Sequence, residues 1–188
     1  KKLQSIFKGI GHHLYFIIYG RIKGVITSDK NSDVELEKVF LQKNLFYKIF
    51  KISNGRIYTD AVTDTAFIIK NKIIEGPSFQ HRDTVNVNCT KNIVFEKGTP
   101  KYLKKIDGSV ISLLTGGAGN HNYFHWMFDV LPRLEIFNKS NIDKDINYYL
   151  LPDTKKKFQK ESLDLLGVDE GKRLSSLNYR HILADTII

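Results

Sequence analysis

Residues 110–134 read VISLLTGGAGNHNYFHWMFDVLPRL, an apolar run followed by a glycine-rich turn and a segment with helical periodicity. Four of the first five residues are apolar, which is typical of a buried strand. The turn at 115–119 holds three glycines, and the apolar residues after it recur at the spacing of a helix. A strand that turns directly into a helix is the unit from which parallel α/β layers are built. The stretch therefore predicts an α/β layer in the second half of the chain.

The elements that follow repeat this rhythm. Residues 148–151 form a short apolar run that Pro152 ends, and residues 154–166 have a helical pattern that ends at Gly167. A further strand is predicted at 182–188. Strands that alternate with helices in this way predict parallel pairing. We therefore expect the fold class α/β, with a β-rich first portion that leads into a Rossmann-like layer.

The first half of the chain is predicted to begin with helices. Residues 1–26 carry apolar residues at helical spacing with lysines on other faces, which is typical of a basic amphipathic helix on a membrane surface, or of a helix or helix-strand pair packed on the domain. Residues 33–50 are also predicted to be helical, because Asp33 can cap and apolar residues recur on one side. We place an N-terminal helical segment at 1–50 and the main domain at 51–188.

Strands are predicted from residue 55 onward. Short apolar runs lie at 55–58, 66–69, 73–74 and 93–95. The polar residues 70–72 predict a tight hairpin between the second run and the third. This region supplies the β-rich portion of the expected fold.

Composition excludes several classes of protein. With 188 residues, 41% hydrophobic and 12% aromatic, the chain is globular and not disordered. No apolar run reaches the roughly 18 residues that a membrane-spanning helix needs. The net charge of +9 attracts anions, but the lysines are scattered and no nucleic-acid-binding motif is present, so no nucleic-acid partner is expected. Cys89 is the only cysteine, which excludes an intrachain disulfide and fits a reducing, cytoplasmic location.

The two ends of the sequence predict that it is a piece of a longer chain. It begins with Lys1, its only methionine is Met127, and it stops within the apolar run at 182–188. We expect this last strand to lie at an open sheet edge and to expose apolar surface, which promotes self-association.

The helical segment after the glycine turn carries a polar stripe. His121, His125 and Asp129 are four residues apart, so they share one face of a regular helix. The segment is apolar on several other sides, which predicts burial. The stripe must then face a cleft or pair internally, because lone buried charges are costly. Pro132 has no amide proton and is expected to bend or restart the helix.

Three interpretations of this stripe are open. It is a catalytic face, with Asp129 as a base and His125 as a binding or orienting group. Alternatively, His121, His125 and Asp129 bind a metal ion in a hydrolase, although the Glu of an HExxH motif is absent. In the third interpretation, His125 and Asp129 are a structural pair. The glycine turn before the stripe either permits positive φ angles or presents a helix N-terminus to a phosphate.

Residues 122–134, NYFHWMFDVLPRL, resemble the N-Y-x-H-W-x-x-D-x-L-P-R-L block of glycosyltransferase family 61. The order of predicted elements is also similar, over roughly residues 50–188. Residues 1–50 match no pattern of the family. Its members include bacterial capsule and lipopolysaccharide glycosyltransferases and eukaryotic transferases of O-linked GlcNAc and xylose.

The resemblance implies an inverting glycosyltransferase that moves a sugar from a sugar nucleotide to a hydroxyl of a glycan acceptor, in the synthesis of a surface polysaccharide. It implies a GT-B-like fold, of which this chain is the N-terminal, acceptor-side half. It also implies that no metal ion or cofactor is needed, with the sugar nucleotide as a co-substrate. Since such a donor is held chiefly by the other half, we expect the 188 residues alone to be inactive.

The family block also implies which residues form the site. Asp129 is the expected base and His125 the second catalytic residue, whereas the expected substrate-binding residues are Asn122, Arg133, His121 and Tyr123. Arg133 either pairs with Asp129 or meets a phosphate, and Tyr123 and Trp126 either hold the helix in the core or stack on a sugar.

Partners follow from the same reasoning. We expect a glycan acceptor and a sugar nucleotide, together with peripheral contact between the basic segment at 1–26 and the inner face of a membrane. The alternatives from other classes are a non-catalytic carbohydrate- or polyanion-binding domain and the metal-dependent hydrolase.

Overall fold

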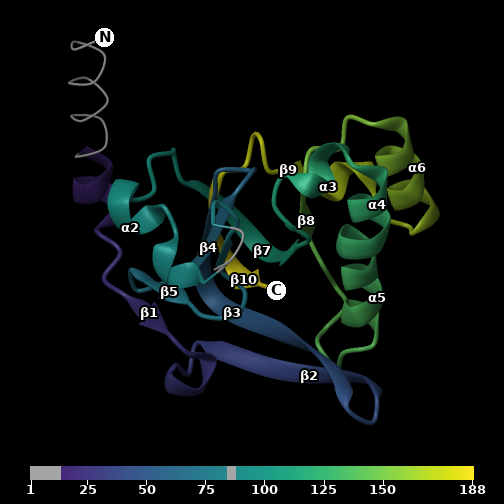
Figure 1. Ribbon diagram of the computed structural model, residues 1–188, viewed down its shortest axis with the longest axis horizontal. Helices are drawn as coiled ribbons and strands as arrows, with labels where there is room; N and C mark the ends of the chain where they lie inside the picture. The colour runs from purple at the N-terminus through teal and green to yellow at the C-terminus, as the bar shows by residue number, and fades with distance from the viewer. Residues whose placement is uncertain (1–13, 84–87) are drawn as a thin grey trace.

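The computed structural model describes residues 14–83 and 88–188, and a mixed sheet with helices at one end organises them (Figure 1). The strands are β1 (Val25–Ile26), β2 (Val34–Gln42), β3 (Leu45–Thr59), β4 (Asp64–Ile69), β5 (Lys72–Ile74), β6 (Phe79–Gln80), β7 (Lys104–Ser112), β8 (Tyr148–Leu151), β9 (Arg173–Ser175) and β10 (His181–Ile187). The longer helical pieces are α2 (Val94–Lys97), α3 (Ala118–His121), α4 (Tyr123–His125), the π-helical turn η3 (Trp126–Val130), α5 (Pro132–Asn138) and α6 (Lys157–Leu165). The structure also contains the 3-10 turns η1 (Ser28–Lys30), η2 (Cys89–Lys91) and η4 (Glu170–Lys172) and a helical segment at residues 14–19.

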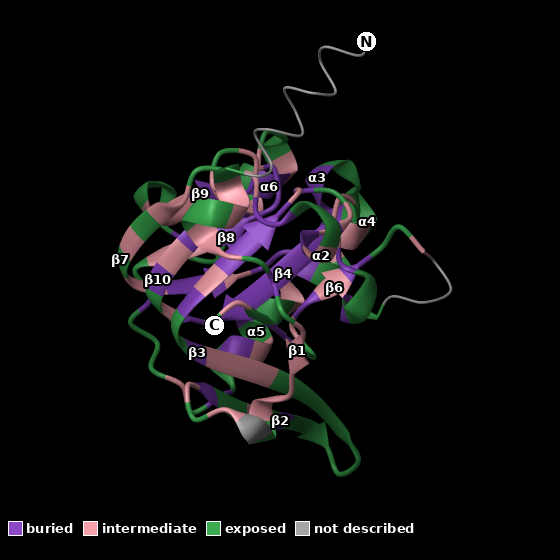
Figure 2. Cartoon of the chain, turned by 90° about the vertical axis from the view of Figure 1, so that its left-hand side faces the viewer, coloured by how far each residue is buried: buried purple, intermediate pink, exposed green. Residues whose placement is uncertain are grey.

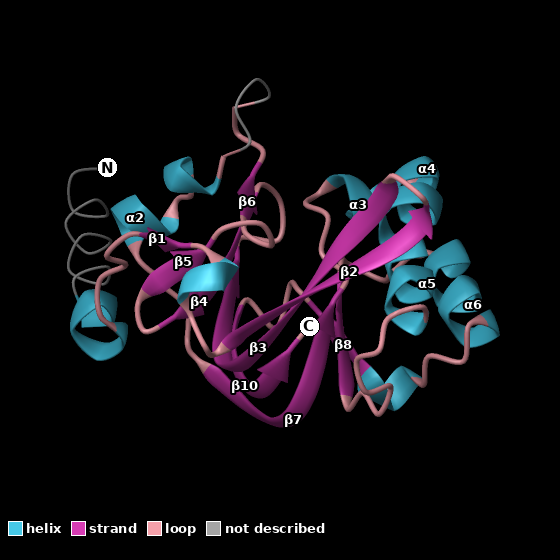
Figure 3. Cartoon of the chain, turned by 90° about the horizontal axis from the view of Figure 1, so that it is seen from below, coloured by secondary structure: helices cyan, strands magenta, loops and turns pink. Residues whose placement is uncertain are grey.

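The strand order across the sheet is β1-β5-β4-β3-β10-β7-β8-β9, with β2 paired to β3 and β6 paired to β4. Strands β10, β7, β8 and β9 run parallel to one another, whereas β3 is antiparallel to both β10 and β4. Helices α3 to α6 gather beside β8, and α2 lies at the far end of the sheet (Figure 3). The predicted mixed α/β fold, with a β-rich first half and a parallel layer after it, is confirmed.

The elements of the second half follow the sequence pattern closely. Strand β8 occupies the predicted run at 148–151, and β7 and β10 cover most of the other two runs. Helix α6 begins three residues later than predicted, at Lys157, and ends before Gly167, whose φ of +71° only glycine adopts without strain.

The prediction that the last strand lies at an open edge is wrong. Strand β10 lies in the middle of the sheet, antiparallel to β3 on one side and parallel to β7 on the other. Ile182, Ala184 and Ile187 are almost completely buried between layers of the core. A run of apolar residues fits a central strand as well as an edge, and only the pairing with β3 decides between them.

The helix predicted at 33–50 is also wrong, because these residues form the hairpin of β2 and β3. The apolar residues fit a two-residue alternation as well as a helical one, and each strand finds its partner across a short turn at Lys43 and Asn44. Strand β3 continues to Thr59 and crosses the boundary predicted between residues 50 and 51. Residues 34–50 therefore belong to the sheet and not to a separate helical segment.

Elsewhere in the first half the hairpin turn predicted at 70–72 is confirmed, whereas the strand predicted at 93–95 is not. Lys70 and Asn71 have φ angles of +46° and +60° and connect β4 to β5 as the tight hairpin that the sequence predicts. The strand predicted at 93–95 is wrong, since Val94 begins the short helix α2. Asn92 explains this start: its Oδ1 accepts from the amide of Val94, while its Nδ2 donates to backbone oxygens of neighbouring strands.

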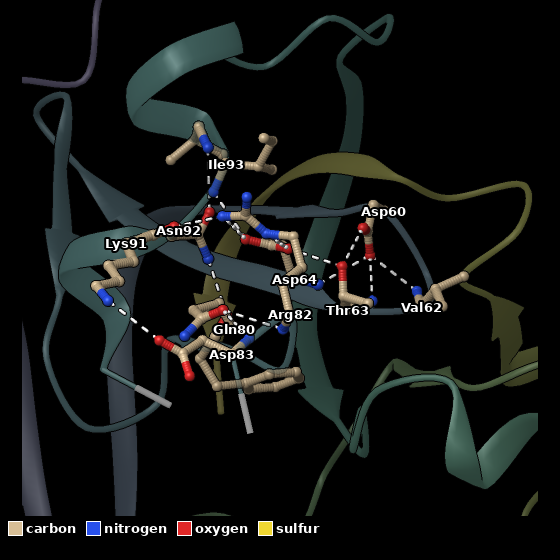
Figure 4. A network of polar contacts seen from close by, with 12 residues as sticks. Asp60, Val62, Thr63, Asp64, Gln80, Arg82, Asp83, Lys91, Asn92 and Ile93 are labelled. Carbon is tan, nitrogen blue, oxygen red and sulfur yellow. Dashed lines mark hydrogen bonds and ion pairs between the residues drawn. The ribbon is translucent and has the colours of Figure 1, made fainter. Parts of the chain in front are cut away.

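A buried carboxylate, Asp64, connects three segments of this half (Figure 4). Its side chain is 1% exposed and forms an ion pair with Arg82, with Nε of Arg82 2.9 Å from Oδ2. Oδ1 accepts from the amide of Ile93 at 2.7 Å, and the hydroxyl of Thr63 donates to Oδ2. These bonds hold the segment after β6 and the turn before α2 against the start of β4.

Half of the basic segment predicted at 1–26 lies outside the described residues, because these begin at Leu14. Residues 14–19 are helical, and the side chains of Leu14, Ile17 and Ile18 are exposed. Within the ranges that the structure describes, no helix is both long and apolar enough to cross a bilayer.

His181, the first residue of β10, is a buried imidazole and 1% exposed. Its Nδ1 donates to the backbone oxygen of Lys101 at 3.0 Å, since a carbonyl can only accept, and its ring packs edge-on against Tyr19 and Tyr58. Nε2 has no hydrogen-bond partner among the described residues. Burial, with a further contribution from the charge of Arg56, lowers the pKa of His181 to about 4 despite the bond to Lys101.

We expect this imidazole to make the protein less stable in mild acid. In the unfolded chain His181 binds a proton below its ordinary pKa of about 6.5, whereas in the folded chain it binds one only below about pH 4. The free energy of unfolding should therefore fall by up to about 3 kcal/mol between these pH values. Urea unfolding of the wild type and of His181→Gln across this range measures the effect. Equal slopes for both proteins would contradict it.

Candidate functional site

The helical segment predicted after the glycine turn consists of four short pieces, α3, α4, η3 and α5. Asn122 interrupts it with an extended backbone, φ −90° and ψ +118°, between α3 and α4. Its Oδ1 accepts from the amides of Phe124 at 2.9 Å and His125 at 3.4 Å, so Asn122 is the N-cap of α4. The residue expected to bind substrate thus also has a structural task, because its side chain starts a new helix.

Pro132 restarts the helix, as predicted. It is the first residue of α5 and supplies no amide hydrogen. Just before it, the amide of Leu131 donates to the oxygen of Trp126, five residues earlier, which widens the backbone into the π-helical turn η3. Such turns are frequent at functional sites. Asp129 lies within this turn.

The polar stripe forms only in part. Nδ1 of His125 lies 2.6 Å from Oδ2 of Asp129. Because a carboxylate can only accept, the imidazole donates its Nδ1 hydrogen. His121 lies in α3, before the break at Asn122, and no hydrogen bond or ion pair of the described structure connects it to either residue. The expected shared face of three residues is therefore a pair.

The break at Asn122 also separates His121 from His125 and Asp129, the other two ligands of the metal interpretation. Across the described parts of the chain, no three His, Cys, Asp or Glu side chains lie together in a way that could hold a metal ion. Asp143 and Asp145, separated by one residue, have the spacing of a metal-binding DxD motif. They are exposed in the loop after α5, where Asp143 accepts from the amide of Asp145, and they are not among the residues that line the cleft described below.

One side of the segment anchors it in the core. Trp126 is completely buried, and its Nε1 donates to the hydroxyl of Ser162 in α6 at 2.9 Å. Val130 and Leu134 pack in the same cluster, against Leu163. Trp126 therefore anchors the helix in the core, which is one of the two roles predicted for it.

The other side is open, which corrects the expectation of burial on several sides. Phe124 and Phe128 are 59% and 65% exposed and pack on each other. Tyr123 is also 59% exposed, and its ring packs edge-on against Phe158 in α6. These rings are available to a ligand or to another surface.

A cleft of about 700 Å³ lies between β3, the end of β7 and the segment η3–α5. Most of its lining is apolar, with Phe50, Phe79 and Phe128 among the larger side chains. Its ionisable lining residues other than tyrosine are Lys48, His81, Asp129 and Arg133. Asp129 thus borders the cleft, and His125 supports it from outside the lining.

Arg133 brings a positive charge next to Asp129. Its Nε donates to the backbone oxygen of Asp129 at 3.0 Å. Desolvation lowers the pKa of Arg133, and the charge of Asp129 partly opposes this effect. The residue is nevertheless exposed to solvent, since it lines an open cleft. The guanidinium stays protonated at neutral pH.

The glycine turn at 115–119 has a packing role in this structure. Gly116 has a φ of +81°, and the amide of Gly117 donates to the oxygen of Val62. A Cβ at Gly119 would lie 2.9 Å from Val130, so glycine allows the turn to touch the helix. Helix α3, which begins within this stretch at Ala118, has only four residues. Of the two interpretations of the turn, these contacts favour positive φ and close approach.

Several residues of the site region gave no signal in the sequence. Lys48 and His81 line the cleft from the first half of the chain, far from any motif. Asn120 and Gln159 are buried and tie α3 to α6, since Nε2 of Gln159 donates to the oxygens of Gly119 and Asn120. Only the folded sheet brings these residues together.

Comparisons of the chain with protein-family models, curated proteins and solved structures each find no match. The likeness to glycosyltransferase family 61 therefore depends on the quoted block and on the order of elements around it.

Proposed function

We propose that this chain is the acceptor-side part of an inverting glycosyltransferase of the surface-polysaccharide type, with a GT-B-like arrangement of two lobes. The observation that carries the proposal is the His125–Asp129 pair, in which a carboxylate borders a large cleft and a histidine holds it at 2.6 Å. The parallel layer of β7, β8 and β9 supports the Rossmann-like part of the proposal.

The chemistry requires one base and a place for a leaving phosphate. Oδ2 of Asp129 accepts the hydrogen bond from His125, which leaves Oδ1 to take the proton of an acceptor hydroxyl. The hydroxyl oxygen then attacks the anomeric carbon of the donor as the bond from that carbon to the phosphate oxygen breaks, and the configuration inverts. The phosphate leaves with the bonding electrons on the face of the sugar opposite the base, whereas the cation of Arg133 lies on the side of the base.

Exposure argues against a purely structural role for the pair. The side chains of His125 and Asp129 are 38% and 47% exposed. An exposed ion pair contributes only about 0–1 kcal/mol to stability. The pair therefore adds little to the stability of the fold, whereas its exposure gives a base access to its substrate.

The full-length protein is expected to transfer a sugar from one of a panel of sugar nucleotides to a glycan acceptor. Proton NMR of the product should show an anomeric configuration opposite to that of the donor. Transfer should persist in excess EDTA, since the cleft offers no clustered ligands among the described residues. A retained configuration would overturn the single-base mechanism, and activity that EDTA removes and Mn²⁺ or Zn²⁺ restores would overturn its independence of metal. Saturable glycan binding without turnover of any donor would favour the binding domain.

A further inference from the structure

The hairpin of β2 and β3 extends beyond the body of the molecule, and its end is exposed (Figure 2). Side chains two residues apart on a strand share a face, so the pairs Leu36–Phe50, Lys38–Lys48 and Phe40–Phe46 lie on one face of the ribbon. Nearer the body this face enters the core through Val34 and Ile52. We call its outer part, formed by Leu36, Lys38, Phe40, Phe46 and Lys48, the basic-aromatic face.

Two lysines face each other on it without a counter-ion. Lys38 is directly opposite Lys48, and like charges in this position destabilise a strand pair. Among the described residues neither lysine has an ion pair, and Nζ of Lys38 lies 4.9 Å from the ring centre of Phe46. The nearby carboxylates belong to the opposite face, where Glu35 pairs with Lys51 and Glu37 accepts from Asn141. An anion is the missing partner of this face.

Large apolar side chains surround these charges. Phe40 is 60% exposed and Phe46 38%, and Leu41 and Leu45, at 40% and 48%, flank the turn that carries Lys43. A soluble polyanion would neutralise the lysines and leave these side chains in water. A second copy of the same face would oppose lysine to lysine. The partner must therefore be both anionic and apolar at its surface.

We propose that the basic-aromatic face and the hairpin turn bind the surface of an anionic lipid bilayer. Phe40, Phe46 and the two leucines enter the interface between headgroups and acyl chains, and the lysines contact lipid phosphates. This surface is distinct from residues 14–19, which lie at the opposite end of the molecule (Figure 1). Lys48 also lines the cleft. When the hairpin is bound to the bilayer, the opening of the cleft therefore lies close to the lipid headgroups. The inference does not depend on glycosyl transfer.

Sedimentation with vesicles tests the proposal on the full-length protein. We expect binding to vesicles of phosphatidylcholine with phosphatidylglycerol, and at least tenfold weaker binding to phosphatidylcholine alone. Lys38→Gln with Lys48→Gln should weaken binding to the anionic vesicles roughly 25-fold, about fivefold for each lysine. Phe40→Ser with Phe46→Ser should weaken it tenfold or more. Ile17→Ser with Ile18→Ser is the matched control and should retain hairpin-dependent binding.

A fluorescent reporter separates insertion from adsorption. Phe46→Trp should show a blue shift of emission with anionic vesicles, relative to the wild type, in which Trp126 is buried. Circular dichroism checks that each variant is folded. The proposal is overturned if binding survives both hairpin double variants, if only the Ile17–Ile18 variant abolishes it, or if neutral vesicles bind equally well. Concentration-dependent dimers that the hairpin variants disrupt would assign the face to a second copy instead.

Discussion

Asp129→Asn is expected to reduce the turnover of sugar transfer by about 10² or more, the range typical for loss of a general base. The substitution keeps the size of the side chain but removes its capacity to take a proton. Because Asp129 is about half exposed and pairs only with His125, the thermal midpoint should change little. Turnover per folded molecule and a thermal melt on the same preparation measure both quantities.

His125→Gln is the companion variant, since it can still donate a hydrogen bond to Asp129. We expect it to lose less activity than Asp129→Asn, because positioning is weakened while the base remains. If Asp129→Asn melts well below the wild type and retains its turnover per folded molecule, the pair is structural and the proposed mechanism fails.

Asp64→Ala should cost about 2–3 kcal/mol of the free energy of unfolding, less than the roughly 3–5 kcal/mol typical of a fully buried ion pair, because Arg82 is 38% exposed and water can solvate its guanidinium. The guanidinium of Arg82 and the amide of Ile93 both lose their carboxylate partner, and the cavity left at a 1% exposed position adds to the loss. Equilibrium unfolding in urea measures the change.

Glu161→Ala provides the control for this prediction, because it breaks the exposed pair with Lys157 and should cost less than about 0.5 kcal/mol. Asp64→Asn should fall between the two variants, since an amide oxygen still accepts from Ile93. A cost below about 1 kcal/mol for Asp64→Ala would mean that water or Thr63 replaces the carboxylate, and the network would not hold these segments together.

Local signals were sufficient where each element carries its own start and stop. The strand at 148–151 ends at Pro152 and the helix α6 ends at Gly167, and both residues act through their own backbone chemistry. The β4–β5 hairpin is likewise encoded by two turn residues, Lys70 and Asn71. Such features do not depend on distant parts of the chain, so the sequence predicts them.

Local signals were misleading where a distant partner decides. The apolar residues at 33–50 fit either period, and pairing with the long strand β3 selects the hairpin. Ile182, Ala184 and Ile187 predict a strand, but its central position follows only from β3 and β7 on both sides. In both cases tertiary contacts outweigh the intrinsic pattern.

Within the candidate site, spacing predicted the contact of His125 with Asp129 correctly because both residues lie after the helix break. It failed for His121 because Asn122 uses its own side chain to cap α4, which a simple count of four residues does not reveal. The cleft residues Lys48, in β3, and His81, directly after β6, lie far from the motif in sequence and could not be assigned from local sequence. The functional assignment itself stays a prediction that the assays above can test.

The central position of β10 affects how the protein emerges from the ribosome. Ile57 in β3 pairs with Ile182 in β10. Strand β10 joins the antiparallel part of the sheet, which ends at β3, to the parallel part, which begins at β7, and its residues are synthesised after both. Before β10 has been synthesised, β3 and β7 each have an unpaired edge, and the backbone donors and acceptors of these edges are exposed in the nascent chain. Pairings of such long sequence separation form slowly. During synthesis this chain should therefore depend on holding chaperones until the strand at 181–187 has left the exit tunnel.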